Sequence, residues 1–434
     1  MKKDLYYENY VDILKEELVP AMGCTEPIAV AYAAAIARQV LGEIPLKVMI
    51  CVSGNILKNV KSVVVPNTGG MRGLPAAVAA GIIAGESEKQ LEVISCVSDE
   101  QKKEINDYLI KTDFTVKASS SNYIFDIDIY LTGAVHKSRC RIAGFHTNVI
   151  CIEKDGKKLK DFPYEETKDF HKTDRSYLKI DNIIDFADTV DIEDVREVIS
   201  RQIDYNMMIA DTGIRNKYGS CIGQTLLKSY GDCVHNRAKA YAAAGSDARM
   251  NGCNLPVVIN SGSGNQGITA SVPVIVYARE MHVSEEQLYR ALVLSNLVTI
   301  HLKTGIGPLS AYCGAVSAGC GAAAGITYLY GGRQKEIKHT IVNALAINSG
   351  IICDGAKSSC AAKIASAVEA GLLGMQMYFQ GCQFYGGDGI VTRGVENTIK
   401  NISQLARVGM AGTDNEIIKI MLSSTEKEQI VSMK

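Results

Sequence analysis

The order of apolar and polar positions divides the chain into three segments. The first segment predicts helices and short strands, which fall at 5–19, 28–41, 47–52, 62–65 and 73–85. The second predicts a β-α-β-β-β order, with elements at 91–97, 98–111, 114–117, 124–131 and 136–153. From about 205 to about 410 the pattern is again helical, rich in Ala and Gly and poor in charge. We therefore expect an α+β protein: a mainly helical domain, residues 1–87 and 166–434, interrupted by a small α+β domain at 88–165.

The stretch from Gly305 to Gly332 carries no charged residue and is long enough to span a bilayer. It is rich in Gly and Ala, however, and has few large aliphatic side chains. Such a composition gains little from lipid and suits close packing of helices inside a protein. We expect a buried helix here, and we expect no contact with a membrane.

Charge and cysteine content narrow the classes of partner and compartment. The 434 residues include 46 Lys and Arg against 47 Asp and Glu, so the formal net charge is −1. This balance excludes an intrinsically disordered protein and gives no electrostatic reason to expect nucleic acid as a partner. The 13 cysteines are an odd number, and the sequence starts without an apolar signal region. We therefore expect a cytoplasmic protein with free thiols.

A glycine-rich loop follows a predicted strand at 256–260. Gly262, Gly264 and Gly267 match the G-x-G-x-x-G spacing of dinucleotide-binding folds, so a nicotinamide-dependent dehydrogenase is one hypothesis. That fold needs further β-α-β units, whereas the chain after Gly267 reads as helical. Backbone N–H groups at the start of a helix also suit a small carboxylate. A tight turn that packs a helix against a strand is the structural alternative.

Cys24 lies just before a predicted helix, in Gly23-Cys24-Thr25-Glu26-Pro27. Thr25 suits the N-cap position of that helix. The helix dipole favours a thiolate at such a place, so Cys24 is a candidate reactive thiol.

Two further pairs of cysteines share a spacing of seven residues: Cys313 with Cys320, and Cys353 with Cys360. On a helix this spacing places both thiols on one face. Four thiolates from two such segments suit zinc or an iron–sulfur cluster. Residues 354–359 read as a loop that enters a helix, which offers backbone N–H groups to a cluster. The remaining cysteines are expected to pack as small apolar side chains.

Several motifs between residues 23 and 360 form a recognisable set. They are Gly23-Cys24-Thr25-Glu26-Pro27, Ser53-Gly54-Asn55, Pro66-Asn67-Thr68-Gly69, Ser261 to Gly267, Leu309-Ser310-Ala311-Tyr312-Cys313-Gly314 and Ile352-Cys353-Asp354-Gly355-Ala356-Lys357-Ser358-Ser359-Cys360. Together they resemble the L-cysteine desulfidases, which are relatives of the iron–sulfur L-serine dehydratase alpha chain. The resemblance implies that the helical domain is catalytic, that the enzyme is a carbon–sulfur lyase, and that relatives form homodimers.

The resemblance also implies roles for individual residues. Cys313, Cys353 and Cys360 would bind a [4Fe–4S] cluster, so Cys320 would not be a ligand, contrary to the spacing argument. Cys24 would be the catalytic residue. Three protein ligands leave one iron open to a substrate's leaving group.

The implied reaction removes sulfide from L-cysteine and gives 2-aminoacrylate, which hydrolyses through an imine to pyruvate and ammonia. Cys24 is the candidate base, and Glu26 is expected to pair with the substrate's ammonium group. The substrate-binding candidates are Ser53, Asn55, Asn67, Thr68, Ser263, Gly264, Asn265, His301 and Lys303. No pyridoxal phosphate is expected.

Two alternatives to an L-cysteine lyase stay open. An L-serine dehydratase would use the same cluster with hydroxide as the leaving group, and the presence of Cys24 in a single chain favours cysteine. A cluster-bearing redox sensor without turnover is the alternative from another class.

Overall fold

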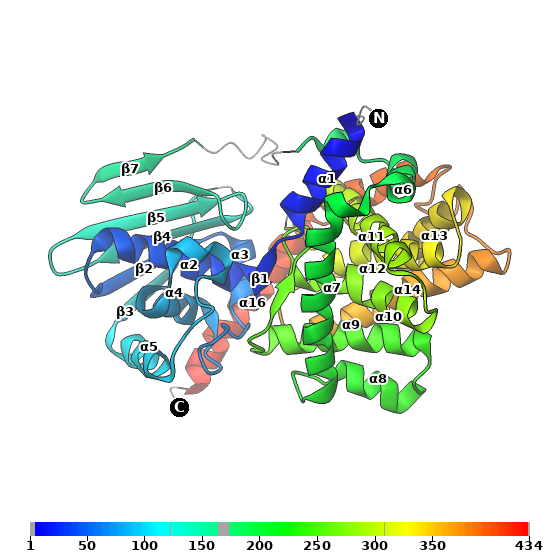
Figure 1. Ribbon diagram of the computed structural model, residues 1–434. Helices are drawn as coiled ribbons and strands as arrows, with labels where there is room; N and C mark the ends of the chain where they lie inside the picture. The colour runs from blue at the N-terminus through cyan, green and yellow to red at the C-terminus, as the bar shows by residue number, and fades with distance from the viewer. Residues whose placement is uncertain (1–4, 122, 164–172, 308, 433–434) are drawn as a thin grey trace.

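The computed structural model describes residues 5–121, 123–163, 173–307 and 309–432, and it has two lobes (Figure 1). One lobe contains a six-stranded sheet with helices packed on it, and the other is a bundle of helices. The prediction of a mainly helical α+β protein is confirmed. Among the described residues, no helix is both long and apolar enough to cross a membrane.

The sheet has the order β3-β2-β4-β5-β6-β7. Its strands are β2 (Lys47–Val52), β3 (Asp113–Ala118), β4 (Asp126–Thr132), β5 (Lys137–Ala143), β6 (Val149–Lys154) and β7 (Lys157–Asp161). β2 pairs in parallel with β3, and every other neighbouring pair is antiparallel. β2 precedes residue 88, so the sheet combines a strand of the first segment with the strands expected at 88–165.

Helices of the same lobe cover one face of this sheet. They are α2 (Thr25–Leu41), α3 (Gly54–Val60), α4 (Gly73–Ala84), the 3-10 turn η1 (Ser87–Glu92) and α5 (Asp99–Lys111). Alternate residues of β2 and β5 are buried, and α2 lies against β4 and β5. The Ala-rich α2 also packs closely on α4. At Gly81 of α4 there is no room for a side chain, since a Cβ would lie 2.1 Å from the carbonyl oxygen of Ala31 on α2.

Two predicted strands of the first lobe are wrong. Residues 91–97 form the end of η1 and a turn, although Leu91, Val93 and Ile94 are buried as a strand would bury them. Gln90, inside η1 and directly before this segment, has a φ of +48°, which a strand residue does not adopt. Residues 62–65 contribute only an isolated bridge between Val64 and Arg72. Short apolar runs do not distinguish a strand from a buried turn.

The second lobe is built from ten helices among the described residues. They are α6 (Ile180–Thr189), α7 (Ile192–Arg215), α8 (Ile222–Tyr230), α9 (Val234–Met250), α10 (Gly264–Glu280), α11 (Glu285–Ile306), α12 (Gly314–Leu329), α13 (Gln334–Ile347), α14 (Ser359–Phe379) and α15 (Val395–Gln404). α12 is buried almost throughout and contacts α10, α11, α13 and α14.

The glycines of α12 explain its unusual composition. A Cβ on Gly319 would lie 2.5 Å from the carbonyl oxygen of Ala367, and one on Gly325 would lie 2.8 Å from that of Ala291. Small residues therefore allow neighbouring helices to approach closely. The buried helix expected at 305–332 is present as α12, but it begins only at Gly314, and residue 308 lies outside the described residues.

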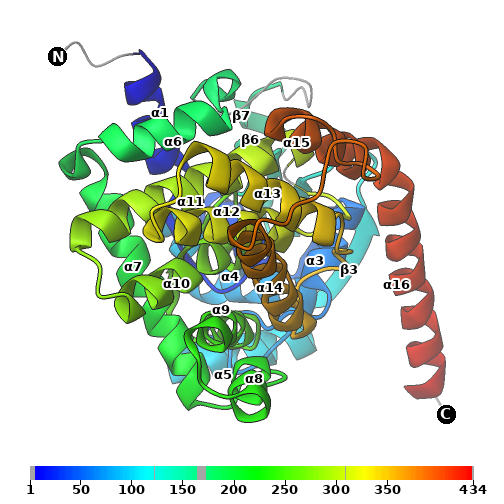
Figure 2. The ribbon, with the colours of Figure 1, turned by 90° about the vertical axis from the view of Figure 1, so that its right-hand side faces the viewer.

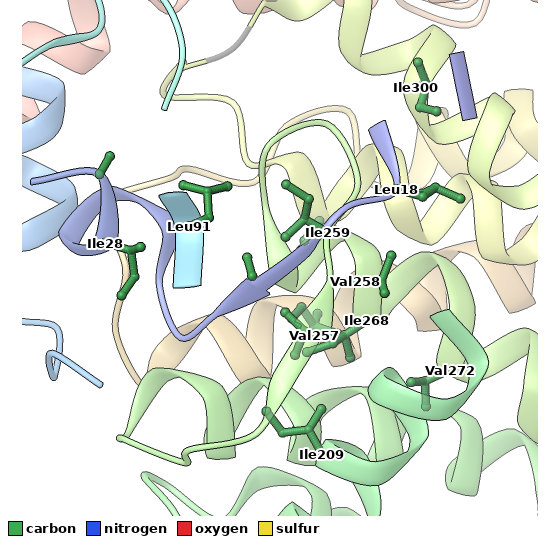
Figure 3. Packing of buried hydrophobic residues seen from close by; sticks show 14 of the residues in the cluster. Leu18, Ile28, Leu91, Ile209, Val257, Val258, Ile259, Ile268, Val272 and Ile300 are labelled. Atoms are coloured by element: carbon green, nitrogen blue, oxygen red, sulfur yellow. The ribbon is translucent and has the colours of Figure 1, made fainter. Parts of the chain in front are cut away.

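The two lobes are joined by short antiparallel strands, β1 (Pro20–Met22) and β8 (Pro256–Val258). α1 (Leu5–Glu17) precedes β1 and packs on α7. Figure 3 shows the apolar cluster around this junction, in which Ile28 of α2 and Val257 of β8 belong to one continuous core. The junction therefore brings the start of α2 close to the glycine-rich loop that follows β8.

The C-terminal segment returns from the helical lobe to the first lobe. The 3-10 turn η2 (Arg175–Tyr177) comes directly before α6. The last elements of the chain are the π-helical turn η3 (Leu405–Gly409) and the helix α16 (Ala411–Ser432). α16 lies along one side of the molecule (Figure 2) and contacts α3. The Lys58 ammonium on α3 forms a buried ion pair with Asp414 of α16 at 2.5 Å.

Glu369 of α14 links two helices of the second lobe and predicts an acid-dependent loss of stability. It pairs with His235 and Lys239 of α9, and the hydrogen bond from His235 lowers its pKa to about 2. A depressed carboxyl pKa stabilises the fold above the unfolded pKa of about 4.3, and this contribution disappears as the pH falls toward 2. Glu369→Gln should therefore lower the free energy of unfolding at pH 7 by less than about 1 kcal/mol, because the side chain is half exposed.

Urea denaturation at several pH values measures this effect. The difference between wild type and Glu369→Gln should shrink between pH 4.5 and pH 2. The exposed Glu197, which has one weaker contact to Arg201 at 3.5 Å, supplies the control variant Glu197→Gln, with no change expected. A difference that stays constant with pH would show that the Glu369 pairs do not stabilise the fold.

Candidate functional site

Four helices begin at one place between the lobes. The Thr25 hydroxyl at the start of α2 donates to the carbonyl oxygen of Gly262, in the loop before α10, at 3.0 Å. The Gln266 side chain lies where a Cβ on Gly314 would be, which joins the starts of α10 and α12. Cys24 packs with Cys360 in the first turn of α14. Since helix N-termini carry partial positive charge, this place favours anions and thiolates.

Cys24 is the N-cap residue of α2, in place of the expected Thr25. It is 2% exposed and packs with Val63 and Met250. Its thiol donates a hydrogen bond to Glu26 Oε2 at 3.1 Å. Burial and the neighbouring Glu26 carboxylate raise the pKa of Cys24 well above that of a free thiol. The structure therefore favours a protonated thiol, because these two effects outweigh the helix dipole that led us to expect a thiolate.

Glu26 is the acceptor at the centre of a hydrogen-bond network. Its carboxylate accepts from the amide of Asn59 at 3.0 Å and from the Cys24 thiol. The Thr25 hydroxyl lies 3.1 Å from the same carboxylate and shares its single hydrogen between Glu26 and the Gly262 carbonyl. Burial would raise the pKa of Glu26, but electrostatic interaction with His146 and Arg249 and the bond from Cys24 lower it below its usual range. Glu26 is therefore an ionised carboxylate beside a protonated thiol, which is a suitable arrangement for proton transfer.

The three predicted ligand cysteines lie at the ends of two adjoining loops. The backbone N–H of Cys313 bonds to the Ile351 carbonyl at 2.8 Å, and that of Cys353 bonds to the Ala311 carbonyl at 2.7 Å. The thiols of Cys313 and Cys353 are hydrogen-bonded, which raises the pKa of Cys313 and lowers that of Cys353. Cys360 follows in the first turn of α14. Neither pair of cysteines seven residues apart lies within one helix, because Cys313 and Cys353 precede their helices.

Two buried lysines face these thiols. Lys303 of α11 is buried, and this burial lowers its pKa to about 8 although the negative potentials of Cys353 and Cys313 oppose the shift. Lys58 of α3 donates to the Cys353 carbonyl at 3.4 Å and lowers the pKa of the Cys353 thiol. Positive charge is therefore placed beside the thiols, as bound thiolates require.

The donor set fits an iron–sulfur cluster. All 13 cysteines are free, and Cys313, Cys353 and Cys360 affect one another's ionisation. In the parts of the chain that the structure describes, no three His, Cys, Asp or Glu side chains are grouped to hold a single metal ion. A four-iron cluster takes each cysteine on a different iron, so its ligands do not need to converge on one point.

The predicted substrate-binding residues divide into two groups. Several use their side chains to fix the local backbone: the Ser53 hydroxyl donates to the Ile124 carbonyl, the Asn67 amide to that of Ile94, and the Thr68 hydroxyl to that of Val65. Likewise His301 pairs with Glu396 of α15 at 2.9 Å.

The second group faces the starts of the four helices. Ser263 is the N-cap residue of α10, and Gly264 and Asn265 form its first turn. Asn55 lies one turn before Asn59 on α3, and its buried Oδ1 has no hydrogen-bond partner within the described residues. Lys303 belongs to this group as well.

The structure adds residues that the sequence analysis missed. They are Lys58, Asn59, His146, Arg249 and Gln266. His146 lies in the loop between β5 and β6, within a segment predicted as one continuous strand. Burial lowers its pKa, although the Glu26 carboxylate opposes the shift. Gln266 lies inside the Ser261–Gly267 motif, but its side chain was not singled out. No local motif surrounds His146 or Arg249, and only the fold brings them to Glu26.

Comparisons with known proteins show the family of the chain. A family model described as serine dehydratase alpha chain matches residues 88–419, which include the three clustered cysteines. A UPF0597 protein of Desulfitobacterium hafniense is 59% identical over 422 residues, covering 97% of this chain and 98% of that protein. Another, of Lachnoclostridium phytofermentans, is 50% identical over 417 residues, covering 96% and 100%. A third, of Treponema denticola, is 47% identical over 424 residues, covering 96% and 98%.

Proposed function

The chain belongs to the serine dehydratase alpha-chain family, and on this basis we propose that it is a [4Fe–4S]-dependent lyase that eliminates sulfide from L-cysteine. The observation that carries the proposal is the grouping of three free thiols, Cys313, Cys353 and Cys360, beside the Cys24–Glu26 pair. The thiols supply ligands, and the pair supplies a proton acceptor. The expected products are pyruvate, ammonia and hydrogen sulfide.

Cys313, Cys353 and Cys360 would hold the cluster. When bound, the cluster supplies a Lewis-acidic iron for the leaving sulfur of the substrate. Lys303, and in part Lys58, which is also paired with Asp414, offset the negative charge of the thiolates. The described residues thus meet the two requirements of such a site, thiolate donors and compensating charge.

The Cys24–Glu26 pair moves the proton of the substrate. As the Cys24 thiol passes its proton to Glu26 Oε2, 3.1 Å away, its Sγ takes the proton from C2 of L-cysteine, so Glu26 stays ionised until this step and no free thiolate forms beforehand. The electron pair of the C2–H bond forms the C2–C3 double bond, and the C3–S bond breaks with its electrons on sulfur. The product, 2-aminoacrylate, tautomerises to an imine, and water then releases ammonia and pyruvate.

L-Serine is the rival substrate, because the family model carries the name of a serine dehydratase. The same residues would act, and hydroxide would leave in place of sulfide. The carboxylate and ammonium groups of the two amino acids are identical, so only the leaving group distinguishes them.

Anaerobic purification followed by iron and sulfide analysis tests the cluster, and separate incubations with L-cysteine and L-serine test the reaction. We expect a brown protein with about four irons per chain that releases sulfide and pyruvate from L-cysteine. A protein without iron after reconstitution would contradict the cluster. Pyruvate from L-serine without sulfide from L-cysteine would establish the dehydratase instead. A brown protein that converts neither amino acid would be a redox sensor.

A further inference from the structure

Arg249, in the last turn of α9 (Val234–Met250), holds a buried positive charge against the glycine-rich loop. The residue is 3% exposed. Its Nε atom would lie 2.3 Å from a Cβ on Gly264, so the guanidinium occupies the space that the glycine leaves open. Its Nη1 donates to the side-chain oxygen of Asn265 at 3.1 Å. The guanidinium is therefore held at the first turn of α10.

This charge has no counter-ion within the described residues. No carboxylate lies within 4 Å of the guanidinium, and Nε has no hydrogen-bond partner there. Arg175 shows the usual alternative, since it is equally buried but forms ion pairs with Glu16 and Glu17. A buried unpaired cation is costly, and functional sites are where proteins keep one.

The start of α10 offers further unused hydrogen-bonding groups. Ser263, its N-cap residue, makes no side-chain hydrogen bond to the first turn. The buried Oε1 of Gln266 has no partner within the described part of the chain. The first backbone N–H groups of a helix lack partners inside the helix and bind anions. The Arg249 guanidinium and the first N–H groups of α10 can therefore bind one and the same anion.

The neighbouring charges define which anion fits. Glu26 is a carboxylate whose pKa Arg249 helps to lower, so the two groups are close enough to interact although they form no ion pair. One fixed positive and one fixed negative charge complement a zwitterion, whereas a phosphate dianion would be repelled by Glu26.

We propose that Arg249, together with the first-turn N–H groups of α10, binds the carboxylate of an α-amino-acid substrate. The substrate's ammonium group then points toward Glu26, and its C2 and C3 atoms lie between Cys24 and the three clustered thiols. Arg249 is the specificity-determining residue that requires a free carboxylate. This inference rests on the proposed function, because it identifies how the substrate of that site is held.

Isothermal titration calorimetry with L-alanine tests the inference without turnover, since L-alanine has the carboxylate and ammonium groups but no leaving group on C3. The anaerobically purified protein should bind L-alanine and should not bind L-alaninamide or inorganic phosphate. Arg249→Gln should weaken L-alanine binding by roughly 100-fold, and Arg249→Lys by less. Arg279→Gln, at an exposed position of α10, is the matched control and should bind as the wild type does.

The melting temperature of Arg249→Gln distinguishes a role of Arg249 in binding from a role in stabilising the fold. Because Gln removes an unpaired buried charge, Arg249→Gln should melt at the same temperature as the wild type or higher in the absence of ligand. A lower melting temperature or failure to fold would overturn the inference, as would unchanged L-alanine binding, equal binding of L-alaninamide, or binding of phosphate alone. Arg249-dependent binding of L-alanine without release of sulfide or ammonia from any substrate would retain the inference and contradict the proposed function.

Discussion

Replacement of Cys24 by alanine is expected to lower turnover of L-cysteine by at least about 1,000-fold while the iron and sulfide content stays unchanged. The reason is that Cys24 donates to Glu26 at 3.1 Å and packs against Cys360, one of the clustered thiols. Loss of its sulfur removes the base but none of the three proposed ligands. Sulfide release and pyruvate formation, measured on protein of known iron content, give the result.

Two control variants separate chemistry from packing at this position. Cys253→Ala removes a thiol that is also buried and lies only three residues after Met250, a contact of Cys24, and it should retain activity. Cys24→Ser keeps the size and the hydrogen bond to Glu26 but replaces the thiol with a much weaker acid, so its activity should stay low. Full activity of Cys24→Ala would remove Cys24 from the mechanism. Loss of iron from Cys24→Ala would show that Cys24 is a ligand instead.

The glycine- and alanine-rich helices were predictable because their cause is local. Uncharged runs such as the one that became α12 must be buried. The order of apolar positions located α1, α2, α4 and α5 within a few residues, whereas the region after residue 205 was predicted as helical without individual bounds. The loop before α14 and the turn before α2 were also evident from local composition. The strands predicted at 62–65 and 91–97 were wrong, because a short segment rich in apolar residues fits a buried turn as well as a strand.

The charges of the site could not be predicted, because they depend on distant partners. The position of Cys24 at the start of a helix suggested a lowered pKa and a thiolate. Burial and the Glu26 carboxylate raise the pKa of Cys24 instead. Arg249 and His146 appear in the sequence without any motif, and they reach Glu26 only because β1 pairs with β8 and the sheet packs beside the helical lobe. Pairing between segments more than 200 residues apart in sequence leaves no local pattern.

Replacement of Cys353 by alanine is expected to remove the cluster. The thiol of Cys353 bonds to that of Cys313, and Lys58 lowers its pKa, so it is the ligand most readily ionised. With two cysteines left, the iron and sulfide content should fall to the background of the preparation and turnover should be lost. Iron analysis and the visible absorbance of anaerobically reconstituted protein measure this.

Cys320→Ala is the matched control, because Cys320 belonged to the four-thiol set that spacing alone suggested. It is 2% exposed inside α12, and burial raises its pKa to about 12, so it lies in the core as an uncharged thiol. Its removal leaves a small cavity that costs about 1 kcal/mol of stability, and iron should be retained. Iron loss from a folded Cys320→Ala, with iron retained in Cys353→Ala, would reverse the assignment. Iron retained in both variants would contradict Cys353 as a ligand. Cys353 is the only one of the three proposed ligand cysteines whose pKa is lowered, so neither of the other two could take its place as a readily ionised ligand.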